Sequence, residues 1–123
     1  MDIRERAVDG VTVLDLSGKI VLGEGDVHIR DRIKDLLADG QRRILLNLAD
    51  VTYIDSAGLG IVLSHWAHTQ RIGVKFAAVG ISERVQVLLD MTGVSKLLPQ
   101  YPTADDAERA FSSVTNSPSV ASV

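Results

Sequence analysis

An aspartate and a serine stand side by side in the stretch YIDSAGLG, where an apolar strand should give way to a helix. Both side chains can accept hydrogen bonds from the first free N–H groups of a helix, but one helix needs a single N-cap residue. If Asp55 caps the helix, the hydroxyl of Ser56 is left accessible at the helix start. The residues that follow have too little side chain to cover it: Ala57, Gly58 and Gly60.

A free hydroxyl at this position is suited to phosphorylation. The N-terminus of a helix carries a partial positive charge, so the fold should tolerate the roughly -1.5 to -2 charges of a phosphate on Ser56. Such a group would change what a partner meets on the surface. A purely structural interpretation stays open, because Asp-Ser before an apolar helix is ordinary capping chemistry and glycines at a helix start allow close packing.

The elements before this turn follow from turn chemistry and periodicity. An Asp-Gly pair at residues 9–10, between two alternating segments, predicts a hairpin of two antiparallel strands. Apolar residues at helical spacing predict a first helix: Ile29, Ile33, Leu36 and Leu37. The run RRILLNL, residues 42–48, predicts an interior strand covered on both faces, so it should lie at the centre of the sheet.

Three helices and two strands are expected after that central strand. The helix that follows Ser56 should bury one apolar face: Leu59, Val62, Leu63 and Trp66. A strand over 74–79 and a helix capped by Ser82 and ended by Gly93 come next. A short edge strand within 96–101 and a last helix opened by Thr103 complete the chain. The sequence thus predicts an α/β fold with a mixed central sheet of four to five strands and about four helices.

Length and composition predict one small domain. The 123 residues are 46% hydrophobic and 24% charged, with a formal net charge of -3 and no cysteine. This composition gives no electrostatic footprint for nucleic acid and no thiolate site. The N-terminus lacks the apolar core of a secretory signal, and no apolar stretch is long enough for a bilayer, so we expect a cytoplasmic protein without membrane insertion. The domain should span residues 1–111, followed by a flexible Ser-rich tail over 112–123.

The segment LNLADVTYIDSAGLGIVL and the order of elements around it resemble the STAS domain of bacterial anti-sigma factor antagonists, over about residues 2–111. The resemblance implies a partner switch. In that family an anti-sigma factor that is itself a GHKL-type serine kinase phosphorylates the serine after the aspartate. The unphosphorylated antagonist binds the anti-sigma factor and frees the sigma factor, and a PP2C-type phosphatase restores it.

Carried onto this sequence, the resemblance makes Ser56 the phosphoacceptor and the chain a regulator rather than an enzyme. ATP and magnesium would belong to the kinase, so no cofactor is expected here. The partner should contact the start of the second helix and the loop over 18–26, at these residues: Asp55, Ala57, Gly58, Gly60, Ile61, Ser64, Glu24 and Asp26. Ala57 replaces a serine common in the family, and the acidic residue usual directly after the glycine at position 18 is absent, Glu24 and Asp26 being the nearest acids.

Other interpretations of the same residues are weaker. A constitutive scaffold or accessory STAS module, in a stress complex or beside a transporter, would make the Ser56 turn purely structural. A serine hydrolase is disfavoured, because Ile54 stands where a nucleophile elbow needs glycine. His65 and His68 lie two to three turns along the same helix from the serine and are expected to be solvated, with no third metal ligand at useful spacing. The segment GEGDVH lacks the third glycine of a dinucleotide fingerprint.

Overall fold

The computed structural model describes residues 1–23 and 25–116 of the chain. Its elements follow in this order: β1 (Asp2–Val8), β2 (Val11–Ile20), α1 (Gly25–Ala38), β3 (Arg43–Ile54), α2 (Ser56–Arg71), β4 (Lys75–Val79), α3 (Glu83–Thr92), the 3-10 helix η1 (Val94–Lys96), β5 (Gln100–Tyr101) and α4 (Ala104–Asn116). The predicted fold class is confirmed, with a five-stranded mixed sheet and four α-helices.

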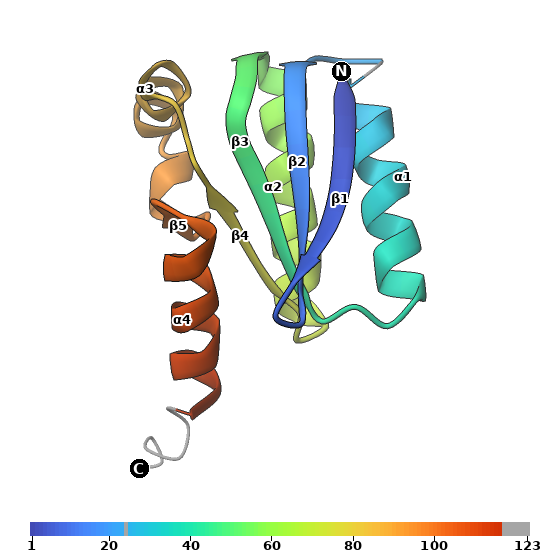
Figure 1. Cartoon of the computed structure of the whole chain (residues 1–123). Coiled ribbons are helices and arrows are strands. Elements are labelled where there is room, and N and C mark those ends of the chain that lie inside the picture. Colours follow the sequence, from blue (N-terminus) through green and yellow to red (C-terminus); the bar gives the residue numbers. More distant parts are fainter. Residues whose placement is uncertain (24, 117–123) are drawn as a thin grey trace.

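The strands lie in the order β1-β2-β3-β4-β5 (Figure 1). The β1–β2 pair is antiparallel and the other three pairs are parallel. In the hairpin between β1 and β2, Asp9 and Gly10 both have positive φ, of 48° and 82°, which is the backbone that an Asp-Gly hairpin turn requires. The strand predicted to be central is β3, in the middle of the sheet. It runs six residues further than predicted, to Ile54, and so reaches the Asp-Ser turn directly.

Two apolar cores lie on opposite faces of the sheet. The larger core packs α1, α2 and α3 against one face; in Figure 1, α2 is seen behind the strands and α1 at the right, beside β1. The smaller core lies under α4 and joins Ala107 and Phe111 to strand residues such as Val13 and Leu45. Residues 44–46 of β3 are all fully buried because alternate side chains enter alternate cores, as predicted for a strand covered on both faces.

The two edge strands of the sheet are either short or charged. Strand β5 has two residues, fewer than the predicted segment 96–101 would allow, because residues 94–96 form a turn of 3-10 helix instead. Strand β1 forms the other edge and carries four ionisable side chains: Asp2, Arg4, Glu5 and Arg6. Helix α4 continues to Asn116, so residues 112–116, which were assigned to the flexible tail, are helical; residues 117–123 of that tail lie outside the described residues.

Candidate functional site

The site forms where β2 and β3 end side by side and α2 begins, at the top of Figure 1. Ile20 and Ile54 are register partners at the last position of the two parallel strands. The backbone N–H of Asp55 donates to the carbonyl oxygen of Ile20 at 3.2 Å, which extends this pairing into the turn. The carboxyl ends of neighbouring parallel strands thus place the loop after β2 next to the first turn of α2.

Asp55 is the N-cap residue of α2, which resolves the choice between the two candidate caps. Its Oδ1 accepts from the Gly58 N–H at 2.7 Å, and its Oδ2 accepts from the Leu22 N–H at 3.2 Å. The Gly58 bond and then the Leu22 bond lower the pKa of Asp55 below its usual value, because both favour the ionised carboxylate. Asp55 is therefore an anion held by backbone groups of two different segments.

Ser56 is exposed as the first residue of α2. Within residues 1–23 and 25–116 its hydroxyl has no hydrogen-bond partner, because the neighbouring aspartate already occupies the cap. The hydroxyl is therefore accessible from solvent, as the analysis of the turn predicted.

The two glycines of the turn have different explanations. A Cβ on Gly58 would lie 2.3 Å from the carbonyl oxygen of Ile20 and 2.8 Å from its Cγ2, so only glycine lets α2 approach the end of β2 this closely. A Cβ on Gly60 would meet nothing within 4 Å, and this glycine is exposed in the helix. The fold therefore explains Gly58, whereas Gly60 leaves the surface beside Ser56 bare.

The other residues expected to bind a partner are distributed along α2. Ser64 is exposed, while Ala57 and Ile61 are half-buried. Glu24 and the side chain of Asp26 lie outside the described residues. The exposed part of the expected surface is thus concentrated at Ser56, Gly60 and Ser64.

An apolar groove that the sequence did not predict lies beside the serine. The groove has a volume of about 400 Å3 and is lined by residues of β3, of the Asp-Ser turn and of α3: Tyr53, Ile54, Asp55, Ser56, Arg84, Val85, Val87, Leu88 and Met91. Three of the large apolar side chains that line it are exposed, with Met91 80% exposed. Val87 and Met91 are four residues apart on α3 and lie outside its buried pair Val85 and Leu89. That spacing was the signal for a second apolar stripe.

Leu22 adds an exposed apolar side chain on the loop that follows β2. It is 71% exposed, although its N–H is bound to the Asp55 carboxylate. Within the described part of the chain, six large apolar side chains are exposed, and four adjoin this turn or its groove: Leu22, Tyr53, Val87 and Met91. Exposed apolar side chains gathered in this way are typical of surfaces that bind a protein, a membrane or a ligand.

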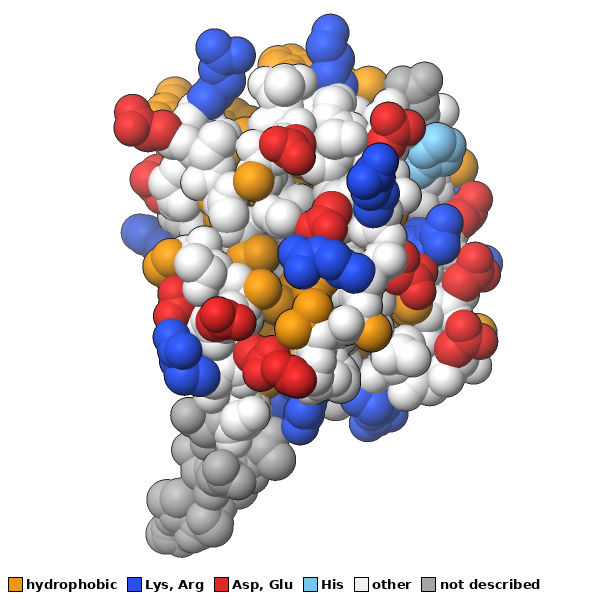
Figure 2. Space-filling model, in the orientation of Figure 1, with side chains coloured by type: hydrophobic (Ala, Val, Ile, Leu, Met, Phe, Trp, Pro, Cys, Tyr) orange, Lys and Arg blue, Asp and Glu red, His pale blue; other side chains and the backbone are white. Residues whose placement is uncertain are grey.

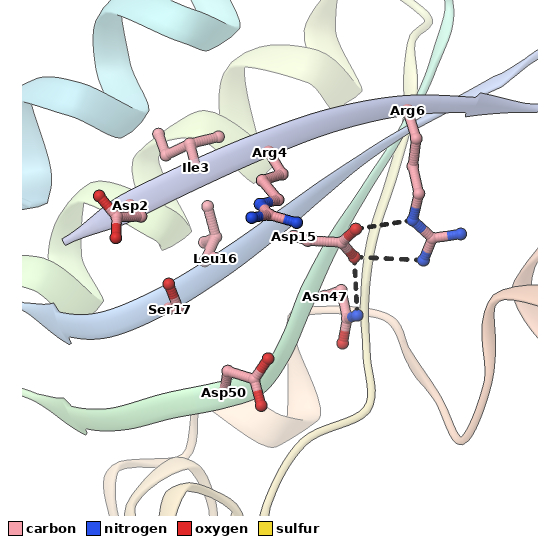
Figure 3. Close-up of a pocket in the computed structure, with 9 residues that line it drawn as sticks. All are labelled: Asp2, Ile3, Arg4, Arg6, Asp15, Leu16, Ser17, Asn47 and Asp50. Atoms are coloured by element: carbon pink, nitrogen blue, oxygen red, sulfur yellow. Dashed lines mark hydrogen bonds and ion pairs between the residues drawn. The ribbon is translucent and has the colours of Figure 1, made fainter.

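A larger polar hollow of about 660 Å3 lies elsewhere, on the part of the sheet that α4 leaves open. Arg6, Asp15 and Asn47 point toward one another there from β1, β2 and β3 (Figure 3). The Asp15 carboxylate accepts from Arg6 at 2.6 and 3.1 Å and from Asn47 at 2.8 Å, and the Arg6 bond is the main cause that lowers the pKa of Asp15. These groups satisfy one another, and Figure 2 shows both signs of charge interspersed over this face.

His65 is not the solvated residue that the helical wheel predicted. It is half-buried, and no described residue is a hydrogen-bond partner for its buried Nε2. Burial lowers the pKa of His65, and the nearby charges of His68 and Arg30 lower it further. The reason is that α2 packs against α1 as well as against the sheet, so a second stripe of the helix is covered.

No helix among the described residues has the length and apolar character needed to span a membrane. Over the same ranges, no three His, Cys, Asp or Glu side chains are grouped so that they could hold a metal ion.

Comparison with known proteins assigns the family. The STAS domain family model matches residues 2–107. The anti-sigma F factor antagonist of Paenibacillus polymyxa is 32% identical over 97 residues, which are 75% of this chain and 79% of that protein. The anti-sigma-B factor antagonist of Staphylococcus aureus is 31% identical over 80 residues, which are 62% and 74% of the two chains.

Solved structures agree with this assignment. An anti-sigma factor antagonist from Mycobacterium paratuberculosis superposes with a TM-score of 0.74 at 28% identity, covering 89% of this chain and 92% of the other. Unphosphorylated SpoIIAA shares the fold, with a TM-score of 0.66 at 20% identity and coverage of 93% and 98%. The chain, with its capped Asp-Ser turn between β3 and α2, therefore belongs to the STAS domain family.

Proposed function

We propose that this chain is an anti-sigma factor antagonist whose binding to an anti-sigma factor is switched by phosphorylation of Ser56. The observation that carries the proposal is the free, exposed hydroxyl of Ser56 among exposed apolar side chains, with Asp55 as the cap. The names of the relatives above support the antagonist role. A Bacillus protein of the same fold, SpoIIAA, has been solved in a phosphorylated form.

The partner in this proposal is an anti-sigma factor that is a GHKL-type serine kinase. The Ser56 oxygen would bond to the γ-phosphorus of the kinase's ATP while the bond from that phosphorus to the βγ-bridging oxygen breaks. ADP leaves, and the hydroxyl proton passes to a base of the kinase. A PP2C-type phosphatase would hydrolyse the phosphoserine and restore the hydroxyl.

The switch works through the surface rather than through refolding. Unphosphorylated Ser56 presents a small neutral group at the edge of the apolar groove, next to the aspartate that binds Leu22, so a partner can pack closely there. A phosphate would bring about two negative charges and three acceptor oxygens into that contact. Desolvating an unpaired charge against an apolar partner costs well over the 1.4 kcal/mol that corresponds to tenfold in Kd.

The experiment is phosphorylation by a GHKL-type serine kinase from the same genome with ATP, followed by peptide mass spectrometry. The expected result is one phosphate at Ser56, absent in Ser56→Ala, with phosphorylation unchanged in Ser112→Ala, which removes an exposed hydroxyl on α4. A phosphate found on another residue would contradict the proposal.

Binding measurements separate the switch from a constitutive scaffold. Ser56→Ala should bind the anti-sigma factor like the wild type, and Ser56→Asp should bind at least about tenfold more weakly. Ser112→Asp, which puts the same charge on an exposed position of α4, should bind normally. Equal binding by Ser56→Ala and Ser56→Asp would instead favour an accessory module without a phosphorylation switch.

A further inference from the structure

The Asp55 side chain does more than cap α2, because its two oxygens bind two separate segments. Oδ1 accepts from the Gly58 N–H at 2.7 Å, inside the first turn of α2. Oδ2 accepts from the Leu22 N–H at 3.2 Å, from a residue 33 positions earlier in the chain. The main chain of Asp55 adds a third bond, from its N–H to the Ile20 carbonyl at 3.2 Å.

These bonds hold a segment whose side chain is otherwise free. Ile20 is fully buried at the end of β2, but Leu22, two residues later, is 71% exposed. Gly23 follows with a φ of 87°, and a Cβ built on it would meet nothing within 4 Å. Packing therefore fixes Ile20, whereas the hydrogen bond to Asp55 fixes the backbone of Leu22.

We propose that Asp55 is a positioning residue that holds Leu22 beside Ser56, so that the loop after β2 and the start of α2 present one partner-facing surface. The use of this surface rests on the function proposed above, whereas the positioning itself can be measured without any partner.

The chemistry explains why the cap is an aspartate. Serine, threonine and asparagine all cap helices well, so capping alone does not require a carboxylate. An ionised carboxylate is the cap with two equivalent acceptor oxygens and no donor. Asparagine at position 55 could accept from Gly58, but its NH2 group would then face the Leu22 N–H, donor against donor. Asp55→Asn thus separates the two roles: it keeps the cap and loses the contact with Leu22.

The test is amide NMR on the purified protein, with Asp55→Asn and Ser82→Ala compared with the wild type. Ser82 caps α3 by accepting from the Val85 N–H at 3.3 Å, so Ser82→Ala removes a cap without touching Leu22. In Asp55→Asn the Leu22 amide should exchange with solvent about tenfold faster, the ratio expected for the loss of one hydrogen bond to a charged acceptor. The Gly58 amide should keep its protection, and Ser82→Ala should leave the exchange of Leu22 unchanged.

A second measurement uses the wild-type protein alone, so it does not depend on whether a variant folds. In the wild type the Leu22 and Gly58 amide shifts should titrate together, at the lowered pKa of Asp55. A Leu22 amide that does not follow this titration, or that exchanges equally in Asp55→Asn and wild type, would overturn the proposal.

A binding measurement links the position of Leu22 to its use. Asp55→Asn and Leu22→Ser should each weaken binding of the anti-sigma factor, and the double variant should bind little worse than either single variant, because both remove the same contact. If the losses of binding free energy in the two single variants add up in the double variant, the link between the two residues is overturned. If the chain binds no anti-sigma factor in any form, the proposed function fails, while the amide measurements still decide the role of Asp55.

Discussion

Alanine at the two glycines of the site should change stability in opposite directions. At Gly60 a Cβ meets nothing within 4 Å and the backbone is helical, so Gly60→Ala should give the full helix-propensity gain of about 1 kcal/mol. At Gly58 the same gain is opposed by a Cβ that would lie 2.3 Å from the Ile20 carbonyl oxygen and 2.8 Å from Cγ2. Overpacking of this kind costs about 1 to 3 kcal/mol.

The contact at Gly58 belongs at the upper end of that range, because backbone rather than a flexible side chain stands in the way. Moving α2 away would relieve this clash, but it would stretch the hydrogen bond from the Asp55 N–H to the Ile20 carbonyl oxygen. With about 3 kcal/mol of overpacking and about 1 kcal/mol of propensity gain, Gly58→Ala should destabilise the fold by about 2 kcal/mol. The two variants should therefore differ by about 3 kcal/mol in the free energy of unfolding.

Urea unfolding followed by circular dichroism measures this difference. With m values of about 1 to 3 kcal/mol/M, the midpoint should rise by roughly 0.3 to 1 M in Gly60→Ala and fall by about twice as much in Gly58→Ala. Equal or greater stability of Gly58→Ala would refute the close approach of α2 to β2. Destabilisation of Gly60→Ala would refute the conclusion that the fold does not require this glycine. Binding of the anti-sigma factor should weaken in Gly60→Ala, because the new methyl group would stand in the surface proposed to face the partner.

Three further changes test the rest of the structure by urea unfolding. Lowering the pH from 7 to 5 should destabilise the protein, because burial lowers the pKa of His65 and the unfolded chain, titrating near 6.5, then binds more protons; His65→Gln should flatten this slope. Asp15→Asn should lower stability at pH 7 by up to about 1 kcal/mol, and the loss should vanish once the pH falls below the lowered pKa of Asp15. Phe111→Ala should cost about 3 kcal/mol, because this ring fills the smaller core under α4.

Each of these three predictions has an outcome that would contradict it. An unchanged slope between pH 5 and 7 in His65→Gln would mean that this histidine does not control acid stability. A loss in Asp15→Asn that persists at low pH would point to packing rather than to charge. A change below 1 kcal/mol in Phe111→Ala would mean that α4 contributes little to the core.

Elements set by local chemistry were predictable from the sequence. The Asp9-Gly10 hairpin, the capped and glycine-ended α3 and the doubly buried β3 all depend on backbone preferences or on short apolar patterns. The helix start at Thr103 was predictable for the same reason, since its hydroxyl accepts from the Asp106 N–H at 3.2 Å. Residue type within a few positions decides such features.

Features that join distant segments were not predictable. The local sequence allowed either Asp55 or Ser56 to cap α2, and the bond from Leu22 to the carboxylate joins residues 33 positions apart. The burial of His65 depends on where α1 lies, which a helical wheel does not contain. The apolar pair Val87 and Met91 was visible in the sequence, but its place beside Ser56 depends on how α3 packs.

The charged edge strand β1 limits how this molecule can associate. A strand added to that edge would have to desolvate up to four ionised side chains, which disfavours sheet extension and fibre growth. The opposite edge offers the two residues of β5, between Pro99 and Pro102, and proline has no N–H to donate. Both edges of the sheet therefore disfavour pairing with a strand of another protein. Contacts with other proteins are expected instead through side chains at the ends of the strands.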